Sequence, residues 1–310
     1  MPIHAPYITR RSLLIGAAST PLAMAASSPA NAAAEMMGIG ATRFNRMKLG
    51  GFEVTTLLVG TRTVENPQAI FGKNVGPAEF AEASQKANIP TDKAQFFFTP
   101  TVVNTGSELV LFDTGLNPEA MTGALQAAGY SPDQIDTVVI THMHGDHIGG
   151  VASEGGVTFA NARHVTGAAE MNFWSGTDGN KAFEAKVRPN MERIEMLEDG
   201  ASVASGITAM AAFGHTPGHM GYMLESDGKQ LMIAADFANH YVWSLAHPDW
   251  EVKFDMDKEA AAMTRKKMLD MMAADRVPFI GYHMPWPAVG YVAKHGEGYH
   301  YVPASYQLML

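Results

Sequence analysis

The sequence predicts an α/β fold in which helices and sheets are layered around one core. Short apolar runs rich in β-branched residues alternate along the chain with stretches whose apolar residues recur at helical spacing. The chain has 310 residues, of which 46% are hydrophobic and 17% charged, enough for a large core and too few charges for a disordered chain. Histidines and aspartates stand directly after several of the apolar runs.

Strands are expected where short apolar runs end in turn-forming residues. The segments at 96–104 and 108–113 should form a hairpin that turns at Thr105-Gly106, and those at 219–225 and 231–235 should be joined across Ser226-Asp227-Gly228. The other expected strands lie at 52–59, 136–141, 207–213 and 277–281.

Helices are expected at 118–128, 166–175 and 257–274, where apolar residues recur every three or four positions. Asn117 precedes the first of these and is a typical N-cap residue. The basic run Arg265-Lys266-Lys267 falls on the last helix, and we interpret it as a solvated face. Together the elements form two β-then-α halves, each with ligand-type residues at strand ends.

The N-terminus has the pattern of a targeting segment. Thr9-Arg10-Arg11-Ser12-Leu13-Leu14 is a twin-arginine motif, and the mild apolar run after it is shorter than the about 20 residues of a membrane span. Ala30-Asn31-Ala32 fits a cleavage site between small residues. We therefore expect a twin-arginine signal peptide at 1–32 and a single domain at 33–310. Export by this route in the folded state would place the protein in the periplasm or outside the cell.

Charge and cysteine content exclude several classes of function. The formal net charge is −9, and removing residues 1–32 takes away Arg10 and Arg11 but no acidic residue, which leaves −11. Such an acidic protein is a poor partner for nucleic acid or anionic lipid, so neither nucleic-acid binding nor stable membrane insertion is expected. The absence of cysteine excludes disulfides, thiolate metal sites and a cysteine nucleophile.

The decapeptide THMHGDHIGG at 141–150 carries the strongest functional signal. It places His142, His144, Asp146 and His147 within six positions, directly after the apolar run at 137–140. Imidazole and carboxylate groups are the nitrogen and oxygen ligands that zinc and neighbouring transition metals accept. On an extended segment His142 and His144 point the same way and could bind one metal ion. Asp146 and His147 follow Gly145, where the chain can turn towards a second ion.

Four ligands do not complete two sites, and further candidates follow downstream. GHTPGH at 214–219 supplies His215 and His219. IAAD at 233–236 places Asp236 at the end of an apolar strand, and FIGYH at 279–283 places His283 in the same context.

With these motifs the chain resembles the metallo-β-lactamase-fold hydrolases, from about Leu49 to about Tyr306. The resemblance implies that 33–310 is one αββα four-layer sandwich. It implies that Asp236 bridges two divalent metal ions, zinc being expected and manganese, iron or cobalt being alternatives. It also implies that Asp113, in LFDTG at 111–115, supports the metal loop, and that His215 lies behind the ligands. The remaining ligands would be His142, His144 and His219 for one ion, and Asp146, His147 and His283 for the other.

The C-terminal third, including ADFANHYVWSLAHPDWEVKFDMD, is similar to the methyl-parathion-hydrolase-like branch, close to the N-acyl-homoserine lactonases. This implies a hydrolase in which a metal-bridging hydroxide cleaves a lactone, an ester or a phosphotriester, with Asp146 and Asp236 as catalytic residues. The expected substrate is a small molecule with an apolar or aromatic part. The resemblance also implies a homodimer.

Aromatic residues near the motifs suggest the walls of a substrate pocket. Phe173, Trp174 and Trp286 are the candidates, each with ordinary core packing as the alternative. The homoserine lactonases carry a tyrosine three residues after the bridging aspartate, whereas this chain has Asn239 there, followed by His240. His240 would protonate a leaving group if it turned inward, or would pack beneath the loop if it did not.

Other functions fit the sequence less well. Redox relatives of this fold carry a glutamate at the position of His144 and bring a flavin domain, and nuclease relatives insert a large domain where only sixteen residues separate His219 from Asp236. Many true β-lactamases have a cysteine at the position of Asp236. A non-catalytic metal-binding protein is the alternative from a different class.

Overall fold

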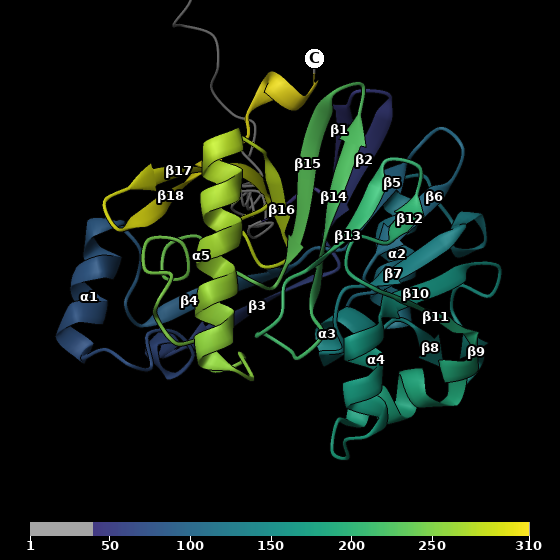
Figure 1. The fold of residues 1–310 in the computed structure, drawn as a ribbon, viewed down its shortest axis with the longest axis horizontal. Helices are drawn as coiled ribbons and strands as arrows, with labels where there is room; N and C mark the ends of the chain where they lie inside the picture. Colours follow the sequence, from purple (N-terminus) through teal and green to yellow (C-terminus); the bar gives the residue numbers. More distant parts are fainter. Residues whose placement is uncertain (1–39, 310) are drawn as a thin grey trace, which may run out of the picture. The chain divides into compact units, whose positions relative to one another are not determined.

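The computed structural model describes residues 40–309, so the expected signal peptide lies outside the described residues. From Thr42 onward the chain forms one compact unit. Most of its strands belong to two seven-stranded sheets (Figure 1).

The first sheet contains the strands that precede the metal-ligand decapeptide. Its strands β6, β7, β10 and β11 run parallel, and the pairs from β1 to β6 are antiparallel. Across the sheet the order is β1 (Phe44–Leu49), β2 (Phe52–Leu57), β5 (Thr101–Asn104), β6 (Leu109–Phe112), β7 (Thr137–Ile140), β10 (Arg163–Gly167) and β11 (Ile194–Leu197).

The second sheet follows the chain order from one edge to the other. Within it, β15 and β16 pair in parallel, and the other neighbours are antiparallel. The order is β12 (Ser202–Ala204), β13 (Ile207–Ala211), β14 (Met220–Ser226), β15 (Lys229–Ala235), β16 (Phe279–Gly281), β17 (Val289–His295) and β18 (Gly298–Pro303). Asp227 and Gly228 both adopt positive φ in the tight turn between β14 and β15, as their residue types allow.

Successive side chains of the first sheet face two different cores. Val110 and Phe112 of β6 belong to the core shared with the second sheet, whereas Leu111 between them belongs to the core under the helices. Val139 and Val138 of β7 divide in the same way. This period-two alternation buries both faces of the sheet.

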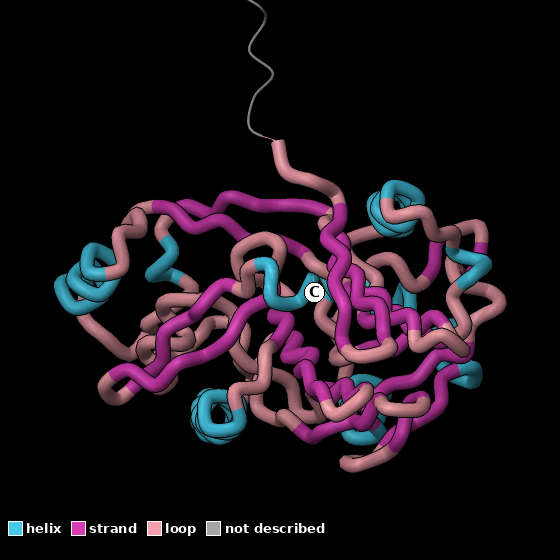
Figure 2. The backbone as a smooth tube through the Cα atoms, turned by 90° about the horizontal axis from the view of Figure 1, so that it is seen from above, coloured by secondary structure: helices cyan, strands magenta, loops and turns pink. Residues whose placement is uncertain are grey.

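Helices cover the outer faces, and seen from above several of them lie at the periphery with strands between them (Figure 2). α2 (Pro118–Ala127) and α4 (Ala168–Ser175) pack on the first sheet, and α5 (Lys258–Asp275) packs on the second. The other helical segments are α1 (Pro77–Lys86), α3 (Gly145–Ile148), η1 (Pro67–Ala69), η2 (Pro132–Gln134), η3 (Phe183–Val187), η4 (Arg188–Arg193) and η5 (Tyr306–Met309). None of the helices described is both long and apolar enough to cross a bilayer.

The expected helices at 118–128 and 257–274 are confirmed to within a residue, and the Asn117 side chain accepts a hydrogen bond of 2.8 Å from the Ala120 N–H as an N-cap. The helix expected at 166–175 begins two residues later, because Thr166 and Gly167 continue β10 beside β11. The long helix also corrects one interpretation: Arg265 is fully buried, although its neighbours Lys266 and Lys267 are exposed.

The strand expected at 96–104 is two strands. Thr99 and Pro100 separate β4 (Lys93–Phe98) from β5, and Pro100 has no N–H with which to continue a ladder. β5 forms the expected hairpin with β6, whereas β4 pairs with β3 (Gly60–Glu65) in a separate two-stranded sheet, which we call the β3–β4 ribbon. A second short pair consists of β8 (Ala152–Ser153) and β9 (Gly156–Val157).

Candidate metal centre

The candidate centre lies where strands of both sheets end. β7 of the first sheet ends at Ile140, two residues before His142. In the second sheet β15 ends directly before Asp236, and β16 ends two residues before His283. Because β15 and β16 are parallel neighbours, their carboxyl ends lie at the same edge of the sheet. The fold therefore brings together ligand-type residues from segments far apart in the sequence.

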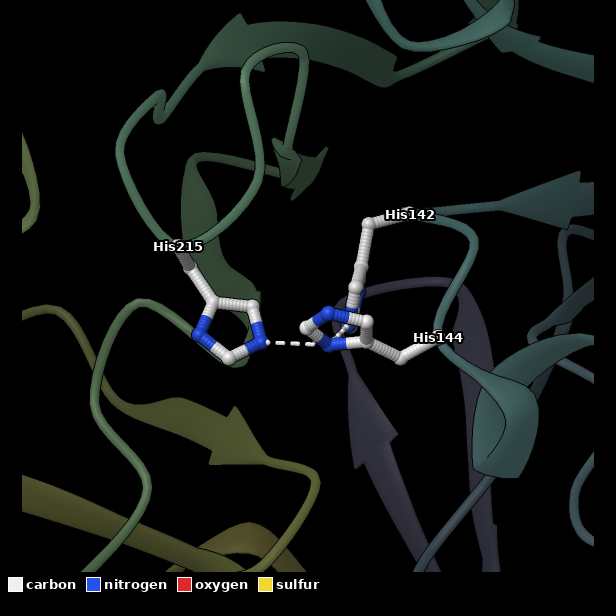
Figure 3. A group of neighbouring side chains, drawn as sticks. All are labelled: His142, His144 and His215. Atoms are coloured by element: carbon white, nitrogen blue, oxygen red, sulfur yellow. Dashed lines mark hydrogen bonds between the residues drawn. The ribbon is translucent and has the colours of Figure 1, made fainter. Parts of the chain in front are cut away.

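One group consists of three imidazoles, His142, His144 and His215 (Figure 3). The distance from His142 Nε2 to His144 Nδ1 is 3.2 Å, and from His144 Nδ1 to His215 Nε2 it is 3.0 Å. Two nitrogens that bind one zinc ion tetrahedrally at about 2.0–2.1 Å lie about 3.3 Å apart. The spacing of the three nitrogens therefore fits a shared cation.

The Nδ1 atoms of His142 and His215 make hydrogen bonds to residues outside the group, and these bonds determine which of the facing nitrogens carry lone pairs. His215 Nδ1–H donates to Asp255 Oδ1 over 2.8 Å. The hydroxyl of Thr141 donates to Asp113, so its oxygen accepts from His142 Nδ1–H at 3.2 Å. The Nε2 atoms of His142 and His215 thus both present lone pairs to His144 Nδ1, which can donate at most one proton. A metal ion satisfies all three nitrogens at once.

A second group contains Asp146, His147 and His283. His283 Nε2 lies 3.3 Å from Asp146 Oδ2, and His147 Nε2 lies 3.8 Å from the same oxygen. Their outer nitrogens are again occupied: His147 Nδ1–H donates to Asp113 Oδ2 and His283 Nδ1–H donates to the Phe97 carbonyl, both over 2.8 Å. Such outer hydrogen bonds orient imidazole ligands in metal sites.

Asp236 lies between the two groups. Its Oδ2 is 3.5 Å from His215 Nε2 and 3.2 Å from His283 Nε2, and its Oδ1 is 3.5 Å from His147 Nε2. Asp236 Oδ1 and His147 Nε2 are both buried and have no hydrogen-bond partner among the described residues. Buried polar atoms are rarely left unpaired, so these two atoms indicate ligands of a cation.

The pKa values of the histidines differ between the two groups. Burial and the neighbouring histidines lower the pKa of His142 well below its usual value, and burial followed by His215 lowers the pKa of His144 to about 3. Burial alone would also lower the pKa of His283, but the carboxylates of Asp236 and Asp146 outweigh it and raise that pKa to about 10. His142 and His144 are therefore neutral at pH 7, while His283 holds a proton that a metal ion would displace.

The structure differs from the sequence expectation at His215 and His219. His215, expected behind the ligands, belongs to the three-imidazole group. His219, expected as a ligand, accepts a hydrogen bond of 3.0 Å from the Asp236 backbone N–H at its Nε2, which occupies that lone pair. His219 therefore holds the backbone of Asp236 in place.

Two buried carboxyl residues support the ligand loops. Asp113, which adopts a positive φ of 60°, accepts hydrogen bonds from the Thr141 N–H, the Thr141 hydroxyl and His147. Glu170 was not predicted. It accepts from the Met143 N–H, the Gly218 N–H, the Thr216 hydroxyl and the Trp174 indole. Glu170 is the single charged residue in the segment AAEMNFW, and this isolated acid was the feature of the sequence that could have indicated a buried carboxylate.

A buried ion pair, also missed, supports His215 from the far side. Arg265 of α5 donates to Asp255 Oδ2 over 2.7 Å, and Asp255 Oδ1 accepts from His215. Arg265 also donates to the Phe237 carbonyl, next to Asp236, over 2.9 Å. One guanidinium thus fixes the surroundings of two candidate ligands.

A cleft of about 540 Å³ opens beside the centre. Candidate ligands form part of its wall, and the β3–β4 ribbon forms another part. It is lined by Arg62, Val64, Ile70, Phe96, Phe98, Leu116, His144, Gly145, Asp146, Asp236, Lys253, Phe254 and His283.

None of the five residues expected in the substrate pocket lines this cleft. Phe173 packs against the core under the helices, and the Trp174 indole donates to Glu170 over 2.7 Å. Asn239 Nδ2 donates to Asp236 Oδ2 over 3.0 Å. The Trp286 indole donates to the Thr42 hydroxyl over 3.3 Å.

His240 packs beneath its loop. Its ring stacks on that of Trp243 with 3.9 Å between centroids, and its Nδ1 accepts from the backbone N–H groups of Val242 and Trp243. Burial lowers the pKa of His240 to about 3. Trp174 and His240 are therefore buried in the core, whereas the aromatic side chains of the cleft are Phe96 and Phe98 of β4 and Phe254.

Comparison with known proteins matches this arrangement to one family. The model of the metallo-beta-lactamase superfamily matches residues 99–280, more than half of the chain. The chain belongs to the metallo-beta-lactamase superfamily. The expected αββα fold of this superfamily is thereby confirmed.

Lactonases are among the relatives of this superfamily member. The solved structure of AidC, a dizinc quorum-quenching lactonase in complex with a product, has a TM-score of 0.77 and 26% identity, and the match covers 84% of this chain and 97% of that one. The hydrolase AbOPH has a TM-score of 0.79 at 23% identity, covering 87% of this chain and all of that one, and shows the fold alone.

Two curated relatives match shorter stretches. An N-acyl homoserine lactonase from Bacillus sp. is 22% identical over 166 residues, 53% of this chain and 62% of its own length. The match thus spans less than two thirds of that relative. A ribonuclease Z from Pyrococcus furiosus is 43% identical over 51 residues, only 16% of each chain.

Proposed function

We propose that this chain is a metal-dependent hydrolase that cleaves lactones or carboxylic esters with the help of two divalent ions. The observation that carries the proposal is the convergence of two ligand groups on Asp236, with Asp236 Oδ1 and His147 Nε2 buried and unpaired within the described part of the chain. Likeness to AidC, a dizinc lactonase, supports zinc as the ion.

The donor set fits such ions. His142, His144 and His215 would hold one, Asp146, His147 and His283 would hold the other, and Asp236 would lie between them. When bound, the ions lower the pKa of a water towards neutrality and polarise the carbonyl of the substrate.

The side chains of the cleft supply the remaining functions. Asp146 is the more exposed of the two carboxylates, with 26% of its side chain accessible, and it lines the cleft. We assign it the transfer of a proton from the attacking water to the leaving alkoxide. Asn239 holds the Asp236 carboxylate in position. Phe96 and Phe98 provide an apolar wall that excludes bulk water from the reacting bond.

The test combines metal content with turnover. Protein loaded with zinc is assayed on an acyl-homoserine lactone, an aryl ester and a phosphotriester, together with Asp236→Asn and the exposed control Asp178→Asn. We expect turnover of the lactone or the ester by the wild type and the control, and loss of metal and activity together in Asp236→Asn. Full loading without turnover of any substrate would contradict the proposal and favour a non-catalytic metal-binding protein.

A further inference from the structure

The charge of the cleft wall outside the metal centre is opposite in sign to the net charge of the chain. The formal net charge of the chain is −9, yet within the part that the structure describes the only acidic residues lining the cleft are Asp146 and Asp236, both in the candidate metal centre. The other charged lining residues are the cations Arg62 and Lys253. Outside the centre, the wall of the cleft is therefore apolar and positively charged.

The register of the β3–β4 ribbon places Arg62 on the face that lines the cleft. It pairs with Phe96, two positions from the pair of Gly60 with Phe98. Because side chains alternate across a strand, Arg62 shares the cleft face with these two phenylalanines. Glu65 and Lys93 form their ion pair of 3.6 Å on the opposite face, so no acidic residue of the ribbon shares the face of Arg62.

Lys253 reaches the cleft from a different segment. Val252 forms an isolated β-bridge with Phe71, and the Lys253 N–H donates to the Ile70 carbonyl over 2.7 Å. These backbone bonds fix Lys253 beside Ile70 and Phe254, which also line the cleft. Among residues 40–309 neither Lys253 nor Arg62 forms a salt bridge.

We propose that the substrate carries an oxyanion, a carboxylate or a phosphate, on its apolar part, and that Arg62 and Lys253 bind it. This inference rests on the proposed function, because it specifies the ester or lactone that the same cleft accepts. An acidic protein repels anions, so local cations are needed to admit one. A guanidinium binds an oxyanion in a bidentate manner, and apolar walls strengthen that attraction.

A matched pair of esters tests the inference. 4-Nitrophenyl hexanoate and mono-4-nitrophenyl adipate share a leaving group and chain length and differ in a distal methyl or carboxylate. We expect zinc-loaded wild type to have a kcat/KM about tenfold higher for the adipate ester. Arg62→Gln and Lys253→Gln should each lower this ratio about threefold, chiefly through KM. Lys93→Gln removes a charge from the opposite face of the ribbon and should leave the ratio unchanged.

The outcomes separate the two proposals. Turnover of both esters with no preference for the adipate, or a ratio that Arg62→Gln does not change, overturns the inference and leaves the hydrolase proposal standing. If the zinc-loaded protein cleaves neither of these esters, calorimetric binding of adipate decides the inference, and equal affinity for wild type and Arg62→Gln overturns it. The hydrolase proposal fails only if the acyl-homoserine lactone is not cleaved either. A third ester, with a distal phosphonate in place of the carboxylate, distinguishes the two oxyanions. A higher ratio of kcat/KM to that of the hexanoate ester for the phosphonate than for the adipate indicates recognition of a phosphate.

Discussion

His215 and His219 lie four residues apart in one loop, but they offer different atoms to their surroundings. Asp255 fixes the proton of His215 on Nδ1 and leaves Nε2 free for a cation, whereas the Asp236 backbone occupies Nε2 of His219. The sequence supplies both histidines at equivalent places. It does not show which of them meets Asp255, forty residues further along the chain.

Replacing each histidine separately should therefore have different results. His215→Ala removes one of three imidazoles and should release the ion held by that group, while His219→Ala should retain both ions. Elemental analysis after dialysis against a weak chelator measures the metal content. Loss of an ion from His219→Ala alone would reverse the assignment.

Metal affinity should rise with pH. In the metal-free protein the pKa of His283 is raised to about 10, from its ordinary 6.5. The stabilisation from its proton is thus fully present below about pH 6.5 and is lost as the pH rises through about 10. An incoming ion must displace this proton, so affinity should increase about tenfold per pH unit over that range.

Competition with a chelator, corrected for the chelator's own protonation, measures this dependence. Calorimetry in two buffers with different ionisation enthalpies counts the protons released. Affinity that does not change between about pH 7 and about pH 9 would contradict the ligand role of His283.

At the scale of elements, α4 joins the two ligand loops through Glu170. Its Oε1 accepts from the Met143 N–H and the Trp174 indole, and its Oε2 accepts from the Thr216 hydroxyl and the Gly218 N–H. Burial raises the pKa of this carboxyl, and the four hydrogen bonds oppose that shift. Both ligand loops therefore depend on one side chain between them.

Glu170→Gln should destabilise the protein by about 1–3 kcal/mol, because an amide NH₂ would face two donors in place of an acceptor. Metal affinity should fall as well, since the loops would separate. Urea unfolding of metal-free protein and metal titration measure the two effects, with the exposed Glu192→Gln as control. Unchanged values in both would show that the loops hold without this carboxylate.

Helix α5 anchors the surroundings of His215 and Asp236 through Arg265. Arg265→Met should cost about 3–5 kcal/mol, because it leaves the Asp255 carboxylate buried without its partner. The double variant Arg265→Met/Asp255→Asn should recover part of this loss, and Lys267→Met on the exposed face of the same helix should have little effect. Denaturant unfolding of all variants gives the comparison. An equal loss in the single and double variants would rule out the buried charge as the cause.

For the whole molecule, periodic patterns predicted the layered fold and the turns between neighbouring strands, because alternation and turn residues are local properties. Which strands pair with each other was harder to predict from the sequence, because pairing joins residues that are far apart in it. β4 was expected to continue into β5, but it pairs with β3, whose partner residues lie 28 to 38 positions earlier. The metal-ligand residue types were evident in the decapeptide, whereas the cleft wall depends on this long-range pairing and could not be inferred from nearby aromatic residues.

Export is a property of the whole chain that the N-terminal motif predicts. Arg10→Lys/Arg11→Lys keeps the charge and removes the twin-arginine pair, so it should retain the protein in the cytoplasm. Fractionation of cells that produce either form measures this, with Arg46→Lys as the matched variant outside the motif. Export of the twin-lysine form would contradict the proposed route.

The β3–β4 ribbon has one further consequence. It belongs to neither seven-stranded sheet, yet it presents Arg62, Phe96 and Phe98 to the cleft. Its sequence can therefore diverge without rearranging the strands that carry the histidines. Selection for new compounds would act first on this ribbon, and relatives with the same centre would differ most there in what they accept.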